Sequence, residues 1–188
     1  MIKSNTQKRQ VFAKSWWGVK WIENMEHYAD KSRIGRGKTY ARNNYVIELH
    51  VKPGLLESRV QGSYSAYSIK LKFDKWTDQE WETFFSVIPT DPEVVYEMLC
   101  GSLPEMIAGL TESRGLYIAP SLKYWLNYEN ISCSCPDFET FCKHVISTCY
   151  LFGEYLDFSF YPLLILRGKY LPNSSEGLSQ NIAGFTKE

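Results

Sequence analysis

The chain has 188 residues, of which 44% are hydrophobic and 15% aromatic, and its 21 Lys+Arg balance its 21 Asp+Glu. This length and apolar content predict one compact unit, with or without a small satellite domain, around a hydrophobic core. No apolar run is long enough to cross a bilayer, and the first residues lack a signal-peptide pattern. The sequence therefore excludes a membrane span and predicts a cytoplasmic protein in a reducing compartment.

Charge is unevenly distributed along the chain, although the total is zero. Residues 1–72 hold 14 Lys+Arg and 5 Asp+Glu, a net charge of +9, whereas residues 73–188 hold 7 Lys+Arg and 16 Asp+Glu, a net charge of −9. This distribution predicts one face for an anionic partner and another face that is neutral or acidic. The alternative is that the two halves neutralise each other across an internal contact.

The N-terminal part divides into a tail and a folded region. Residues 1–10 are polar and basic and predict a flexible tail, and residues 11–75 form a basic α/β region. Its first element is a helix that ends near Asp30, with Ser15 as the expected N-cap. The helix is indicated by apolar residues at helical spacing, namely Trp17, Trp21, Met25 and Tyr28.

The next stretch, residues 31–42, holds five basic residues and no acidic one. Gly35 and Gly37 make it a poor helix or strand, so the sequence predicts a basic loop. Guanidinium groups fork onto phosphate oxygens, which makes this loop the leading candidate for nucleic-acid contact. The alternative is a solvated loop, or arginines that pair within the protein or with the acids of a partner. The candidate phosphate-binding residues are Arg33, Arg36, Lys38 and Arg42, and the candidate stacking residues are Tyr40 and Tyr45.

Three strands are expected next, at residues 45–51, 55–61 and 66–73, because apolar and polar side chains alternate there. The pattern predicts a half-buried antiparallel meander. Its open face is basic and adds Lys70 and Lys72 to the candidate nucleic-acid contacts. The apolar face needs a helix, and the Trp-rich first helix is expected to cover it.

Residues 76–113 are expected to form an acidic helical region. Thr77 followed by Glu80 is a capping-box pattern, Asp91 caps a second helix, and a third short helix begins near Pro104. These amphipathic helices are expected to pack on one another. Their outer face could dock a partner protein.

The most specific pattern in the chain is C-x-C-x6-C-x-H, formed by Cys133, Cys135, Cys142 and His144. Three thiols and one imidazole complete a tetrahedral ligand set for one structural Zn2+ and leave no position for a catalytic water. In a reducing compartment, clustered thiols bind metal more often than they form disulfides. Buried core cysteines and redox pairing are the alternatives.

Residues 114–171 are expected to hold this finger and an apolar C-terminal segment, and residues 172–188 a flexible or partner-bound tail. A strand leads into Cys133, and a helix that begins near Phe141 carries Cys142 and His144 in its first turn, a ββα type of finger. Its N-terminus favours the negative charge of a thiolate. The predicted fold class is α+β: an N-terminal helix on a three-stranded antiparallel sheet, a helical middle, and this C-terminal zinc finger.

The cluster resembles the SWIM zinc finger, whose signature is C-x-C-x(n)-C-x-H. Flanking stretches similar to those of prokaryotic SWIM-finger proteins extend the resemblance over most of the chain. They are Phe12-Ala-Lys-Ser-Trp-Trp-Gly18, Arg36-Gly-Lys-Thr-Tyr-Ala-Arg42, Val60-Gln-Gly-Ser63 and Leu166-Arg-Gly168. The resemblance implies a small, cytoplasmic, non-enzymatic protein whose finger binds DNA or protein, in prokaryotes often linked to a helicase-like ATPase of the Swi/Snf type.

The sequence offers little from which to build an active site. Of its three histidines, His144 is a ligand, and His27 and His50 are expected on the surface. No nucleophile-elbow motif, no Cys–His pair outside the metal cluster and no clustered set of aspartates is present. A nuclease built from scattered carboxylates is the remaining enzymatic alternative.

We therefore expect a non-enzymatic zinc-finger accessory subunit of a nucleic-acid-processing complex, without a small-molecule substrate. It would bind DNA or RNA through the basic loop and sheet and would dock a protein partner. The other hypothesis is an assembly subunit that contacts only protein.

Overall fold

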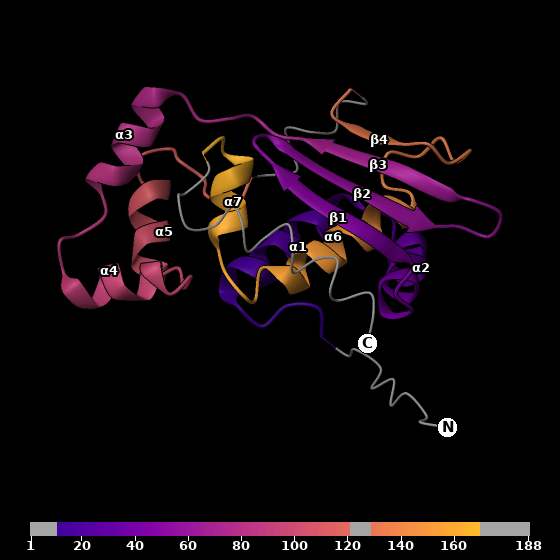
Figure 1. Ribbon diagram of the computed structural model, residues 1–188, viewed down its shortest axis with the longest axis horizontal. Coiled ribbons are helices and arrows are strands. Elements are labelled where there is room, and N and C mark those ends of the chain that lie inside the picture. The colour runs from indigo at the N-terminus through magenta and orange to yellow at the C-terminus, as the bar shows by residue number, and fades with distance from the viewer. Residues whose placement is uncertain (1–10, 121–128, 170–188) are drawn as a thin grey trace.

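A computed structural model describes residues 11–120 and 129–169 of the chain. The fold of these residues combines helices with one antiparallel sheet (Figure 1). The two predicted tails lie outside the described residues. The sheet has the order β1-β2-β3-β4. Three of its strands are consecutive, and the fourth comes from much later in the chain and pairs with β3, so that Ile69 lies opposite Cys133. The strands are β1 (Val46–Lys52), β2 (Leu55–Gln61), β3 (Ala66–Lys72) and β4 (Ile131–Cys133).

The two faces of the sheet differ as the alternating pattern predicts. Leu56, Val60, Ile69 and Leu71 are buried on one face. A bulge between Val46 and Glu48 shifts the alternation in β1, so that Val46 is buried and Ile47 is only partly buried. The opposite face carries exposed polar and charged side chains, including His50, Lys52, Arg59, Lys70 and Lys72.

The helix that covers the sheet is α6 (Lys143–Tyr155), which packs against all four strands. The sequence assigned this place to the first helix, α1 (Trp16–Tyr28), and that assignment is wrong. α1 begins at its predicted N-cap Ser15 and packs on α6, with Trp21 reaching Phe73 at a ring-centroid distance of 5.9 Å. α6 takes the inner position because its residues are almost entirely apolar or small and are buried nearly all round.

The expected basic loop is a helix, α2 (Lys31–Arg42). Asp30 is its N-cap and accepts hydrogen bonds from the backbone N–H groups of Ser32, at 2.8 Å, and Arg33, at 3.3 Å. Gly37 faces α6 so closely that a Cβ atom there would lie 2.3 Å from Cγ2 of Ile146. This glycine therefore permits a close helix–helix approach and does not mark a loop.

The acidic helices α3 (Asp78–Ser86), α4 (Pro92–Leu99) and α5 (Glu105–Glu112) lie at the end of the molecule opposite α2 (Figure 1). The capping box of Thr77 and Glu80 and the Asp91 cap are present as predicted. A few polar contacts join this region to the rest of the protein, including the ion pair of Lys20 with Glu112. Trp16 Nε1 donates to Leu103 O at 2.8 Å, and Tyr161 Oη, in α7 (Tyr161–Leu166), donates to Met98 O at 2.6 Å.

Three single residues outside the cluster differ in burial. Cys149 is fully buried, but Cys100 is exposed at the end of α4. Arg167 is buried, and its Nε donates to Tyr117 O at 3.0 Å. Across residues 11–120 and 129–169, no helix has the length and apolar character that a bilayer crossing requires.

Candidate metal centre

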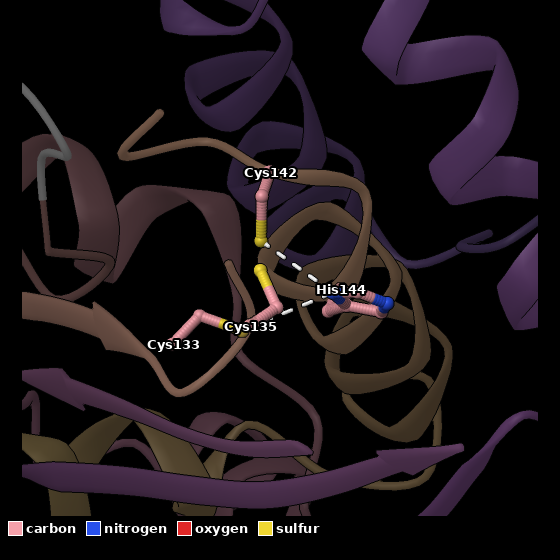
Figure 2. A group of neighbouring side chains, drawn as sticks. All are labelled: Cys133, Cys135, Cys142 and His144. Carbon is pink, nitrogen blue, oxygen red and sulfur yellow. Dashed lines mark hydrogen bonds between the residues drawn. The ribbon is translucent and has the colours of Figure 1, made fainter. Parts of the chain in front are cut away.

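Two segments of the chain bring the four predicted ligands together (Figure 2). Cys133 is the last residue of β4, and Cys135 follows it after a turn. Cys142 is the N-cap of α6, and His144 lies in the first turn of that helix. A short strand precedes the cluster, and the helix that follows it begins at Lys143, two residues later than predicted.

The spacing of the four ligand atoms fits a single metal ion. The Nδ1 atom of His144 lies 3.9 Å from the Cys133 sulfur and 3.8 Å from the Cys142 sulfur. All four ligand atoms lie within 4.8 Å of one another. A tetrahedral ion with bonds of about 2.0–2.3 Å holds its ligand atoms about 3.5–3.8 Å apart, so a small contraction would close the shell. The site could hold one metal ion with protein ligands alone.

The neighbouring backbone fixes the Cys133–Cys135 turn against the sheet. The N–H of Ser134 donates to Ser68 O at 3.0 Å, and the N–H of Ser68 donates to Ser134 Oγ at 2.9 Å. On the helix side, Thr148 Oγ1 donates to His144 O at 3.0 Å and lies 2.6 Å from Ser58 Oγ in β2. Both halves of the cluster are therefore attached to the same sheet.

The sulfur atoms differ strongly in their electrostatic environment. The pKa of Cys142 is lowered to about 4, mainly by a hydrogen bond with Cys133. His144 and the backbone N–H groups at the start of α6 also favour the thiolate, and together these interactions outweigh the effect of burial. The pKa of Cys133 is raised in turn, mainly by its hydrogen bond with Cys142, and burial raises that of Cys135. One thiolate is therefore ready to bind a cation, and a bound cation would deprotonate the other two.

The imidazole of His144 is buried and contacts two tyrosine rings. Its centroid lies 4.8 Å from that of Tyr67 and 5.4 Å from that of Tyr40. Nε2 is buried without a hydrogen-bond partner, whereas Nδ1 faces the sulfurs. Nδ1 is therefore the nitrogen that could bind a metal ion together with the sulfurs, and Nε2 would then carry the ring proton.

Several of the predicted phosphate-binding residues have partners within the protein. Arg33 forms an ion pair with Asp137 in the finger, Lys38 pairs with Glu26 at 2.9 Å, and Lys70 with Glu57 at 3.5 Å. Arg42 lies over the Phe12 ring at 5.4 Å. Arg36 and Lys72 are exposed and form no ion pair with another described residue.

The structure also places the aromatic candidates. The ring centroids of Tyr40 and Tyr45 lie 4.8 Å apart, and the Lys143 ammonium lies 4.7 Å from the Tyr40 ring centroid. Tyr45 is 40% exposed. Sequence reasoning missed Tyr64, which is 97% exposed, and Phe138, which is 96% exposed. Their neighbours could have indicated them, because Tyr64 lies in a Gly-Ser-Tyr-Ser turn and Phe138 lies in the loop between Cys135 and Cys142.

The chain is similar to the uncharacterized protein Rv2102 of Mycobacterium tuberculosis, with 31% identity over 176 residues. The alignment covers 93% of this chain but 61% of that relative, so the chain spans about three fifths of the relative's length. No protein-family profile and no solved structure matches the chain.

Proposed function

We propose that the cluster binds one Zn2+ as a structural ion and that the chain is a non-enzymatic accessory subunit of the prokaryotic SWIM-finger type. The observation that carries this proposal is the closed ligand set, in which Cys133, Cys135, Cys142 and His144 converge on one point. Thiolate and imidazole ligands select zinc among the common divalent ions, and four protein ligands leave no position for a substrate or reactive water. The zinc joins β4 to α6 and thereby holds the helix that covers the sheet.

Nucleic acid is the partner that we propose for the end of the molecule around this site. Arg36 is exposed on α2, which packs on α6, and Lys72 is exposed on the open face of the sheet at the far end of β3. Tyr64 and Phe138 are almost fully exposed, and aromatic rings of this kind stack on unpaired bases. We propose that this contact is made in the cytoplasm and that the nucleic acid is DNA or RNA.

The two exposed rings belong to the same end of the sheet. Tyr64 lies in the hairpin between β2 and β3, and Phe138 lies in the loop that leaves β4. Because the N–H of Ser134 donates to Ser68 O, the finger loop begins beside the first residues of β3, next to that hairpin. A single strand that crosses this end could meet both rings and continue along the open face of the sheet toward Lys72.

The first test measures metal content and nucleic-acid binding of the purified chain. We expect one equivalent of zinc, and micromolar or weaker binding of a labelled single-stranded oligonucleotide that weakens steeply with salt, followed by fluorescence anisotropy. Arg36→Glu together with Lys72→Glu should remove most of this binding. Arg114→Glu is the matched control, because Arg114 is an exposed arginine at the acidic end. Equal loss in the control, or no binding by the wild type, would contradict the nucleic-acid part of the proposal.

A purely protein-binding role is the second candidate function. A surface on the acidic helices favours it, and that surface is compatible with the first proposal because it lies at the other end of the molecule (Figure 1).

A further inference from the structure

Helix α4 has two apolar faces although a surface helix needs only one. Val94 and Met98 lie four positions apart, and Met98 is buried toward the protein. A second apolar stripe faces solvent, in which Tyr96 is 68% and Leu99 70% exposed. This outer stripe consists of Pro92, Val95, Tyr96 and Leu99, at the i, i+3, i+4, i+7 spacing of a packing face. A helix with such a face on its outer side is built to pack against something else.

The neighbouring helices carry more exposed apolar side chains. Six of the eleven large apolar residues exposed in the described part of the chain lie between residues 85 and 117, a small fraction of its length. Beside the α4 stripe these include Met106 and Leu110 on the outer face of α5, four positions apart. A concentration of this kind marks an interaction surface, whereas single exposed apolar residues do not.

The charge of this region is entirely negative. Residues 76–113 contain eight Asp and Glu and no Lys or Arg. Of these eight acidic residues, Glu112 alone forms an ion pair with another described residue, namely Lys20 of α1. Glu93 and Glu97 are exposed on α4, directly beside the apolar stripe. A partner that covers the stripe therefore meets carboxylates at its rim.

The protein itself already places a cation on this region. The Lys169 ammonium lies 5.2 Å from the Trp81 ring and 5.6 Å from the Phe85 ring of α3. An ammonium over an aromatic face is attracted by the negative potential of the ring. The aromatic groups of α3 thus accept a lysine here, which shows the kind of side chain that suits this end of the molecule.

We propose that the outer stripe of α4 docks a cationic amphipathic helix of a partner protein. Its apolar face would cover Tyr96 and Leu99, and its lysines or arginines would face Glu93 and Glu97 at the rim. The proposal rests on the proposed accessory role, for which it defines the partner's chemistry, but it does not depend on zinc identity or on nucleic-acid binding. A short, continuous helix fits best because the stripe itself is one straight helical face.

The test uses the full chain and a synthetic helix as the probe. The probe is a labelled peptide of about 18 residues, with leucine on one face and lysine on the other, which is long enough to form a helix. We expect wild-type protein to bind it, and Tyr96→Ser with Leu99→Ser to weaken binding about tenfold or more. Both residues are exposed, so the variant should fold normally. Tyr64→Ser with Phe138→Ser removes similar exposed surface at the other end and should leave binding unchanged.

Two further measurements decide the role of charge and the identity of the occupant. Glu93→Gln with Glu97→Gln should reduce binding severalfold at low salt and less at high salt, and a peptide with glutamate in place of lysine should not bind. Amide shifts in a 15N spectrum should be confined to α4 and α5.

The proposal is overturned by equal binding to both double variants, by equal binding of the acidic peptide, or by a Kd weaker than about 1 mM. It is also overturned if sedimentation shows that the stripe instead joins two copies of this chain. None of these outcomes changes the zinc content or the oligonucleotide binding, which test the proposed function separately.

Discussion

The two ends of this molecule are held together by different means. At the metal end, β4 joins the sheet through its backbone ladder, α2 packs closely on α6, and four ligands converge between strand and helix. At the acidic end, α3, α4 and α5 are attached by scattered hydrogen bonds, by the ion pair of Lys20 with Glu112 and by buried side chains that are largely aromatic. The first end is cross-linked by many interactions that depend on one another, whereas the second depends on a few buried side chains.

The stability of the two ends should therefore depend to different degrees on a single interaction. A metal site that joins a strand to a helix makes the surrounding structure depend on one ion. The acidic end has no such dependence, and its helices can keep apolar side chains on the surface because only one face of each is needed for packing. Variants should therefore have sharply different effects at the two ends.

The largest effect is expected from Cys142→Ser. Structural zinc in finger peptides contributes about 10–16 kcal/mol of apparent binding energy, comparable to the whole stability of an ordinary domain at about 5–15 kcal/mol. We therefore expect loss of the metal and loss of cooperative unfolding of α6 and the sheet. Elemental analysis and circular dichroism during thermal unfolding measure both changes.

The control for this variant is Cys100→Ser, because Cys100 is exposed and follows α4, which lies at the end of the molecule opposite α2. Its metal content and melting temperature should equal those of the wild type. Retention of one metal equivalent and full helical signal by Cys142→Ser would show that the metal end does not depend on its cluster.

The next effect contrasts the two faces of α4. Met98 is 8% exposed and Leu99 is 70% exposed, although they are adjacent on one helix. Met98→Ala should destabilise the protein by about 2–5 kcal/mol through lost burial and a cavity, whereas Leu99→Ala should change stability by less than about 0.5 kcal/mol. Urea unfolding compares the pair. Similar losses for both would mean that the outer stripe is covered within the chain itself.

Helix α2 offers a matched pair of glycines for the metal end. A Cβ at Gly37 would lie 2.3 Å from Ile146, whereas nothing lies within 4 Å of a Cβ at Gly35. Gly37→Ala should therefore cost about 1–3 kcal/mol by overpacking. Gly35→Ala should be neutral or stabilising by up to about 1 kcal/mol, because alanine favours the helix. If unfolding midpoints show the reverse order, the close approach of α2 and α6 is wrong.

The same helix shows why part of the fold could not be read from the sequence. The caps Ser15, Thr77 and Asp91 were predictable because a cap depends on neighbouring residues. The role of Gly37 depends on Ile146, which lies more than a hundred positions later, so its local signal predicted a loop. Propensity could not identify a packing partner that only the tertiary fold supplies.

The metal cluster, like the helix caps, was predictable because its residues are close in sequence. Its four ligands lie within one short segment, so spacing alone predicts that they converge, and the structure confirms this for Cys133, Cys135, Cys142 and His144. The ion pair between Arg33 and Asp137 joins residues 104 positions apart. Sequence reasoning offered such internal pairing only as an alternative for the basic residues of α2, and could not say which arginine takes which acid.

That ion pair gives the smallest and most specific prediction. Asp137→Asn removes the charge but keeps an oxygen for the N–H of Glu139, which donates to Asp137 Oδ1 at 3.3 Å. Both partners are partly exposed, so we expect a loss of only about 0.2–1 kcal/mol in urea unfolding. Arg33 is then released from the finger. Oligonucleotide binding should therefore become stronger, with a salt slope steeper by about one phosphate contact.

The pH dependence of stability distinguishes this pair from a simple change in net charge. The hydrogen bond from Arg33 holds the pKa of Asp137 below its ordinary value. The contribution of this ion pair to the free energy of unfolding is therefore complete above the ordinary aspartate pKa. It disappears as the pH falls through the lowered pKa of Asp137, and Asp137→Asn should lack this dependence. Glu139→Gln removes the same charge from the same loop but leaves the ion pair intact. Equal gains in oligonucleotide binding by both variants would mean that net charge, and not the release of Arg33, governs the affinity of this end.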